Sequence, residues 1–163
     1  MEIKVSSIKK IKEDLKSANT DNIKLIIASS YDNNIENIEK EKKLFLHFDD
    51  ISIIRQNSFN RDIAKQINNF VKEIDFDNEE LYVCCDSGVS RSSAIAAAIL
   101  RKYKQNEDVI WKNYNYKPNL LVYKTLCDEF NLVNYPMRLK HKENINKKAL
   151  KKRIEESKRK RLL

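Results

Sequence analysis

Short apolar runs alternate with amphipathic segments along most of the chain. Runs rich in β-branched residues predict four strands, at residues 3–7, 23–30, 43–48 and 80–85. Between and after them, apolar residues spaced three or four apart predict helices, at residues 8–15, 59–74, 90–104 and 118–130. This alternation indicates a single α/β domain with a mostly parallel central sheet flanked by helices.

Two of the predicted helices have recognisable start signals. Ser58 is a suitable N-cap for the clearest amphipathic helix, and Pro118 suits the first position of the last predicted helix. Their apolar stripes are Phe59, Ile63, Ile67, Phe70 and Ile74 in the first, and Leu120, Tyr123, Cys127 and Phe130 in the second. The polar segment 31–43 is interpreted as a loop or a weak exposed helix.

The net charge of +8 is concentrated at the C-terminus. Residues 138–163 contain twelve Lys or Arg against three Glu, whereas residues 1–137 contain twenty basic and twenty-one acidic residues. We therefore expect an α/β domain over 1–137 and a basic tail over 138–163, either helical or disordered. The tail is either simply solvated or makes weak contact with nucleic acid or another acidic surface.

The composition of the chain indicates its cellular compartment and whether a metal site or a membrane span is expected. Three cysteines, two of them adjacent, make a poor disulfide framework, so we expect a reducing, cytoplasmic location. With two histidines and no cysteine pair at zinc-ligand spacing, no metal site or cofactor is expected. No signal peptide is recognised, and the longest apolar run, residues 94–100, is too short to span a bilayer. The oligomeric state cannot be inferred.

The only glycine of the chain, Gly88, lies in the stretch "CDSGVSRS", between a predicted strand and a predicted helix. A loop that enters a helix N-terminus directs unpaired N–H groups inward, and the helix dipole adds positive charge. Such a loop binds phosphate-like anions. Gly88 gives the loop its backbone freedom, and Arg91 adds a planar pair of donors. Cys85, at the strand end, would face the same positive field, which favours the thiolate nucleophile.

The stretch resembles the signature of cysteine-dependent protein tyrosine phosphatases: cysteine, five residues, arginine, then serine or threonine. The Ser-Arg-Ser ending places it nearest the dual-specificity branch. The segments "IKLIIASS", "LFLHFDDI" and "PNLLVY" are also similar to small bacterial and phage members, over roughly residues 1–135. A nucleotide-binding P-loop would need a second glycine and a Lys-Ser/Thr pair. Rhodanese and arsenate reductase remain less favoured alternatives.

The resemblance implies a mechanism. Cys85 attacks phosphorus and forms a phosphocysteine, while Ser92 donates to the thiolate. The phosphate-binding loop comprises Asp86, Ser87, Gly88, Val89, Ser90 and Arg91. An upstream aspartate protonates the leaving oxygen; the candidates are Asp49 and Asp50, and we favour Asp50, with Asp49 at the substrate. The expected activity is phosphate monoester hydrolysis, by default on protein phosphotyrosine, with phosphoserine and phosphothreonine also open.

Two positions depart from the family pattern. Cys84 replaces the usual histidine before the nucleophile, which predicts a less stabilised thiolate; we expect its side chain to pack in the core. Asp86 places a carboxylate in the loop, but the loop acts through its backbone, so this side chain can point to solvent. These departures keep open a non-catalytic phosphate-binding module. An RNA 5′-phosphatase is a third possibility, for which the basic tail is the only indication.

The remaining candidates have competing interpretations. Cys127, on an apolar stripe, is most simply a core residue, although Cys84 or Cys127 pairing with oxidised Cys85 is an alternative. The stretch "WKNYNYKPN", residues 111–119, mixes aromatic and basic side chains, which can stack on bases. Packing together with a role at the pocket rim is the favoured interpretation.

Overall fold

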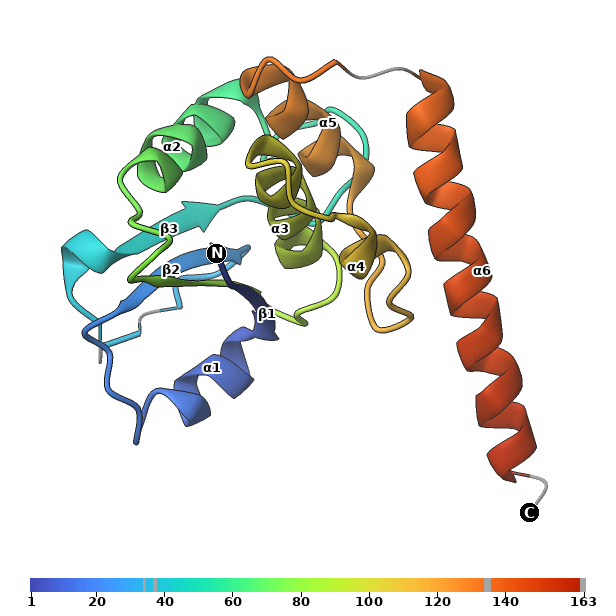
Figure 1. Ribbon diagram of the computed structural model, residues 1–163, viewed down its shortest axis with the longest axis horizontal. Helices are drawn as coiled ribbons and strands as arrows, with labels where there is room; N and C mark the ends of the chain where they lie inside the picture. The colour runs from blue at the N-terminus through green and yellow to red at the C-terminus, as the bar shows by residue number, and fades with distance from the viewer. Residues whose placement is uncertain (34, 37, 134–135, 162–163) are drawn as a thin grey trace.

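The computed structural model describes residues 1–33, 35–36, 38–133 and 136–161. Among these residues a parallel sheet of four strands has the order β1-β4-β2-β3 (Figure 1). The strands are β1 (Ile3–Ser7), β2 (Ile23–Ser29), β3 (Lys43–His47) and β4 (Glu80–Cys85). All four agree with the predicted strands to within one residue, so the α/β class and the parallel sheet are confirmed.

Helices cover the two faces of the sheet unequally (Figure 1). On one face lie α2 (Arg61–Lys72), α3 (Arg91–Lys102) and α5 (Leu120–Glu129), and on the other lies α1 (Ile8–Asp14). A short helix, α4 (Asp108–Trp111), contacts α3, and the long α6 (Pro136–Arg161) follows α5. The chain thus forms a central sheet with a thick helical layer on one side and a thin one on the other.

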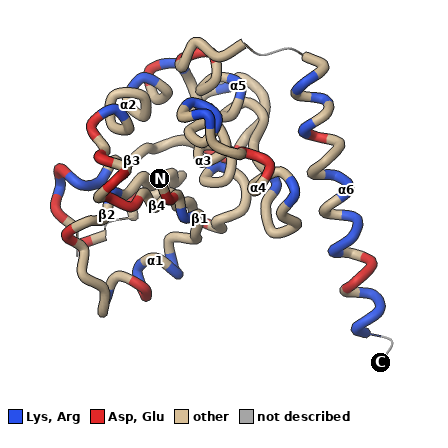
Figure 2. The backbone as a smooth tube through the Cα atoms, in the orientation of Figure 1, with Lys and Arg blue, Asp and Glu red and all other residues tan. Residues whose placement is uncertain are grey.

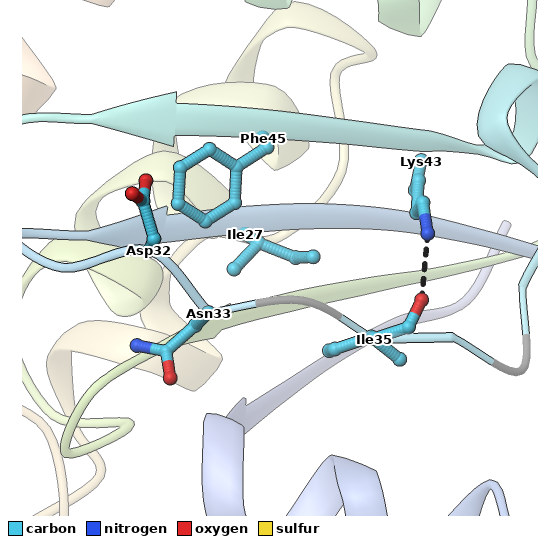
Figure 3. A pocket seen from close by; sticks show the side chains of 6 residues that line it. All are labelled: Ile27, Asp32, Asn33, Ile35, Lys43 and Phe45. Carbon is cyan, nitrogen blue, oxygen red and sulfur yellow. Dashed lines mark hydrogen bonds between the residues drawn. The ribbon is translucent and has the colours of Figure 1, made fainter.

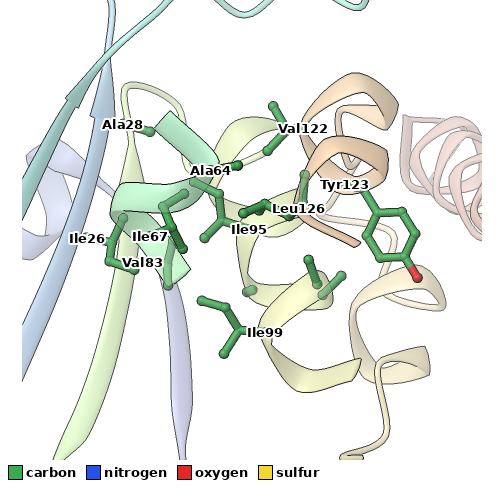
Figure 4. Close-up of a cluster of buried hydrophobic side chains, with 14 of the residues drawn as sticks. Ile26, Ala28, Ala64, Ile67, Val83, Ile95, Ile99, Val122, Tyr123 and Leu126 are labelled. Atoms are coloured by element: carbon green, nitrogen blue, oxygen red, sulfur yellow. The ribbon is translucent and has the colours of Figure 1, made fainter. Parts of the chain in front are cut away.

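The main core lies between the sheet and the α2, α3 and α5 layer (Figure 4). Helix α3 is buried along nearly its whole length, as its apolar sequence predicts. A smaller cluster lies under α1. Because successive strand residues point to opposite faces, Cys85 belongs to the main core and Cys84 to the α1 cluster. The prediction that Cys84 packs in the core is confirmed.

Both predicted helix starts are wrong by two residues. Helix α2 begins after Asn60, whose side chain accepts a hydrogen bond from the Ile63 N–H at 3.0 Å. Ser58 instead accepts one from the Arg55 N–H, within the preceding turn. Similarly, α5 begins after Asn119, which caps its first turn, and Pro118 lies outside the helix. In each case an asparagine, which is also a strong N-cap, occupies the position.

Two other segments were less predictable. In the polar segment 31–43, a short 3₁₀ turn covers Lys40–Lys42, and residues 34 and 37 lie outside the described residues. Helix α4 was not expected, because its four residues are too few for a periodic pattern. Trp111, at its end, is buried against Tyr123 with ring centroids 5.1 Å apart, which confirms packing as its role.

Helix α6 carries the excess of positive over negative charge (Figure 2), and its first half packs against the body. Leu139 and Ile145 contact the main core. The buried Lys142 forms ion pairs with Asp108 and with Glu107, itself a buried carboxylate that also accepts from Trp111 and Tyr123. The basic segment is thus part of a helix as far as Arg161. Its N-terminal part is anchored to the body by buried polar contacts. No helix of the described residues is both long and apolar enough to cross a membrane.

Replacing Lys142 tests this anchor. Lys142→Ala leaves the buried Glu107 and Asp108 with fewer charged partners. We expect a loss of about 1–3 kcal/mol in the free energy of unfolding, measured by urea denaturation. Lys140→Ala, an exposed change on the same helix, should stay within about 0.5 kcal/mol of wild type. Equal effects of the two substitutions would contradict an anchoring role.

Candidate active site

The predicted loop lies where the carboxyl ends of the parallel strands meet. Cys85 is the last residue of β4, and the register sets it beside Ser7 at the end of β1 and Ala28 near the end of β2. Residues 86–90 connect β4 to α3, which begins at Arg91. The strand–loop–helix context expected from the sequence is therefore present, at the edge where open α/β sheets bind ligands.

Gly88 is required by two separate features of this loop. Its φ of +71° lies in the left-handed region, which residues with a Cβ rarely adopt. In addition, a Cβ at this position would lie 2.5 Å from the Ser7 nitrogen and 2.6 Å from the Ser6 carbonyl carbon. The loop thus packs directly against the backbone at the end of β1. A side chain at residue 88 would displace the loop from the sheet.

The carbonyl groups at the end of the loop are engaged, which orients the peptide units. The Val89 oxygen accepts from the Lys117 N–H and the Ser93 hydroxyl. The Ser90 oxygen accepts from the N–H groups of Asn119 and Ala94. By contrast, no hydrogen bond between described residues uses the N–H of residues 87–90 as donor. Together with the first turn of α3, these N–H groups form a donor set suited to an anion.

Cys85 and Ser92 are in direct contact in this loop. The Cys85 Sγ lies 3.0 Å from the Ser92 Oγ, and both side chains are buried. At this distance the hydroxyl can donate to a thiolate.

Arg91 is held from three parts of the chain. Its Nη1 donates to the Phe48 carbonyl oxygen at 2.7 Å and to the Ser30 hydroxyl at 3.2 Å, and its Nη2 pairs with Asp86. The guanidinium group also lies over the Phe48 ring, 5.7 Å from its centroid. Its Nε is buried and has no hydrogen-bond partner among the described residues. An unpaired buried donor is rare in folded proteins.

The Asp86 side chain, which could have pointed to solvent, is instead engaged within the site. Its carboxylate accepts from the Ser29 hydroxyl at 2.6 Å and from Arg91, and it is partly buried. Burial opposes ionisation, but the hydrogen bonds from Ser29 and Arg91 outweigh it and lower the pKa of Asp86. Sequence reasoning missed this because Ser29, at the end of β2, reaches Asp86 only when β2 and β4 are neighbours in the sheet.

The two candidate acids differ in their contacts. Asp50 is exposed, and its Oδ1 accepts from the Ser90 hydroxyl and from the Asn119 side-chain amide, each at 2.8 Å. Asn119 also donates to the Ile51 carbonyl oxygen, so it joins the 49–51 segment to the start of α5. For Asp49, which is half-buried, no side-chain hydrogen bond to the loop occurs among the described residues. Of the two, Asp50 is the one joined to the loop.

A solved structure shares the fold of this chain. A crystal structure of the Cydia pomonella PTP-2 phosphatase superposes with a TM-score of 0.57 at 15% identity, covering 77% of this chain and 84% of that one. The fold is that of the protein tyrosine phosphatases. A second crystal structure, PTPMT1 in complex with PI(5)P, gives a TM-score of 0.44 at 12% identity over 93% and 94% of the two chains. No family model and no curated protein matches the sequence significantly.

The other cysteines of this phosphatase fold lie away from the loop. Burial raises the pKa of Cys84 well above its usual range, with Cys85 and Asp86 adding to the effect. Burial likewise raises the pKa of Cys127 to about 11. All three cysteines are free thiols. Among the described residues no cluster of three His, Cys, Asp or Glu side chains could hold a metal ion.

The fold leaves two hollows near the carboxyl edge of the sheet. The first, about 380 Å³, adjoins the loop at Val89 and Ser90 and is bordered by Asp50, residues 117–120 and helix α6. The second lies on the α1 side of β2 and β3, where Lys43 donates to the Ile35 carbonyl oxygen at 2.6 Å (Figure 3). Its walls are largely apolar, with Ile27, Ile35 and Phe45 facing inward. Only the first hollow is continuous with the loop.

Several residues that hold the loop were missed by sequence reasoning. Ser30, the Phe48 carbonyl and Asn119 contact Arg91 or Asp50 from segments 40 or more positions away. Ser30 and Phe48 are the last residues of two predicted strands, so their position at the carboxyl edge was the available signal. Asn119 ends the stretch 111–119, for which a role at the pocket rim was predicted, but nothing in the sequence pattern pointed to its contact with Asp50.

The pairing of Asp86 predicts a pH-dependent stability. Since the pKa of Asp86 is lowered in the folded state, its ionised form stabilises the fold at pH values above the unfolded pKa of about 4. That contribution is lost as the pH falls through the folded pKa. We expect Asp86→Asn to lose about 1–3 kcal/mol of unfolding free energy at pH 7. The difference from wild type should shrink at a pH of about 3 in urea titrations. A pH-independent difference would contradict this assignment.

Proposed function

We propose that the protein is a metal-independent phosphatase that hydrolyses phosphate monoesters through a phosphocysteine intermediate. Its default substrate is phosphotyrosine in proteins, and dual specificity would add phosphoserine and phosphothreonine. The observation that carries the proposal is the contact of the Cys85 Sγ with the Ser92 Oγ, at the start of a loop whose N–H groups at residues 87–90 make no hydrogen bond among the described residues. Arg91 stands at the end of the same loop, where its Nη groups keep the guanidinium in place.

The chemistry follows from the contacts of Cys85. Its sulfur attacks phosphorus, so that an S–P bond forms as the P–O bond to the leaving group breaks. The N–H groups of residues 87–90 and the Arg91 Nε bind the other phosphate oxygens. Water then attacks phosphorus and breaks the S–P bond, releasing phosphate and the thiolate. The Ser92 hydroxyl, 3.0 Å from the sulfur, stabilises that thiolate.

Asp50 is proposed as the general acid and then the base. Its Oδ1 already accepts two hydrogen bonds, from Ser90 and Asn119, so Oδ2 is the oxygen that carries the transferable proton. That proton passes to the leaving oxygen in the first step, and Oδ2 takes one from water in the second. Ser90 joins the carboxylate to the same loop that would hold the phosphate.

The setting is proposed to be the cytoplasm. Three free, buried cysteines suit a reducing compartment. The competing function is a module that binds a phosphorylated partner without turnover. Asp86, which already engages the arginine, and Cys84 in the usual histidine position favour that alternative.

Replacing Cys85 distinguishes a phosphatase from a module that only binds a phosphorylated partner. Wild type should release p-nitrophenol from p-nitrophenyl phosphate in the presence of EDTA. Cys85→Ser should lower kcat by more than about 10⁴-fold, because serine is a far weaker nucleophile here. Cys84→Ser is the matched control, since its side chain lies on the opposite face of the sheet. Absence of turnover in wild type, with phosphate binding retained in both forms, would establish the binding module.

Leaving-group dependence identifies the acid. With phenyl phosphate, whose leaving group needs a proton, Asp50→Asn should lower kcat by about 10²–10⁴-fold. With p-nitrophenyl phosphate the loss should be much smaller. Asp49→Asn should show little difference between the two substrates. Equal losses in the two variants would remove Asp50 from this role.

A further inference from the structure

Helix α6 forms one wall of the hollow beside the loop. From α6 come Glu143, Asn146, Lys147 and Leu150, facing Val89 and Ser90 of the loop. At about 380 Å³ the hollow falls within the range of about 300–1,000 Å³ typical of ligand sites. The C-terminal helix, whose sequence predicted at most weak contact with an acidic surface, therefore borders the proposed active site.

This wall is fixed in position. The buried Asn146 donates to the Trp111 carbonyl oxygen at 3.2 Å and to the Tyr116 carbonyl oxygen at 3.0 Å. One turn earlier, Lys142 is anchored to Asp108 and Glu107. Because Lys147 directly follows Asn146, its place at the hollow is set by these contacts.

Two cations of the hollow are available to a ligand. Lys117 and Lys147 are both exposed, and neither forms an ion pair with a carboxylate of the described residues. Val89, Leu120 and Leu150 supply apolar walls between them. A surface with apolar walls and unpaired ammonium groups is complementary to a peptide with acidic side chains.

We propose that α6 is a substrate-binding wall, and that Lys117 and Lys147 bind acidic side chains next to the phosphorylated residue of a protein substrate. This inference rests on the proposed function, because it assigns the substrate class of the same site. The phosphate occupies the loop, and the flanking peptide lies in the hollow.

The hollow fits an acidic peptide better than RNA. Asp50 and Glu143 also line the hollow and oppose any anionic ligand, so the distinction from RNA rests on the aromatic side chains. Recognition of single-stranded RNA needs exposed aromatic rings for base stacking. Trp111, the aromatic residue of this hollow, is only 1% exposed and cannot stack on a base.

Lys147→Gln in the full chain tests the inference, with two phosphotyrosine peptides as probes, one flanked by glutamates and one by glutamines. We expect KM for the glutamate peptide to rise about three- to fivefold, the contribution of one exposed ion pair, with kcat unchanged. KM for the glutamine peptide should not change. Lys147→Arg should restore the preference. Lys148→Gln is the matched control, because the adjacent position points away from the hollow.

Each outcome decides the inference. Equal changes for both peptides, or no difference between Lys147→Gln and Lys148→Gln, would overturn it. A 5′-phosphorylated RNA oligonucleotide with a higher kcat/KM than either peptide would also overturn it. If wild type hydrolyses nothing, the proposed function fails, but peptide affinities still test α6. The ratio of Kd values for the two peptides, measured on Cys85→Ser with and without Lys147→Gln, should then fall by the same factor.

Discussion

The close approach of Gly88 to the end of β1 is the constraint on which the site depends. The loop after β4 contacts the backbone of Ser6 and Ser7, at a distance that leaves no room for a Cβ. That contact fixes the turn at the carboxyl edge of the sheet, with Cys85 at its start and α3 at its end. The backbone N–H groups and the sulfur are positioned together because one rigid strand and one buried helix hold both ends of a short loop.

Arg91 extends this arrangement to the rest of the sheet edge. Its contacts reach Ser30 after β2, Phe48 after β3 and Asp86 in its own loop. A guanidinium held on both Nη groups loses little freedom when its Nε binds an anion, so the site is preorganised. The ion pair with Asp86 helps to hold the guanidinium in this position. A carboxylate in the loop that is proposed to bind phosphate is therefore compatible with the site.

Helix α6 connects the basic C-terminus to the same edge. Its buried polar residues, Lys142 and Asn146, bind the α4 region, and the next residue, Lys147, lies at the hollow beside the loop. Part of the positive charge that the sequence assigned to a solvated tail therefore lies next to the proposed phosphate site. In the proposed complex, electrostatic attraction at this position would act on the flanks of a substrate and not on the phosphate itself.

The sequence by itself determined the four strands, the buried character of α3 and the "CDSGVSRS" loop, because periodicity, β-branched runs and a lone glycine are local signals. It did not determine helix starts where two capping residues compete, as at Ser58 and Asn60. Only the tertiary structure decided that Asp86 pairs with Arg91, that Asn119 holds Asp50, and that α6 borders the hollow. These contacts join residues far apart in the chain, and they exist because parallel strands bring their carboxyl ends to one edge.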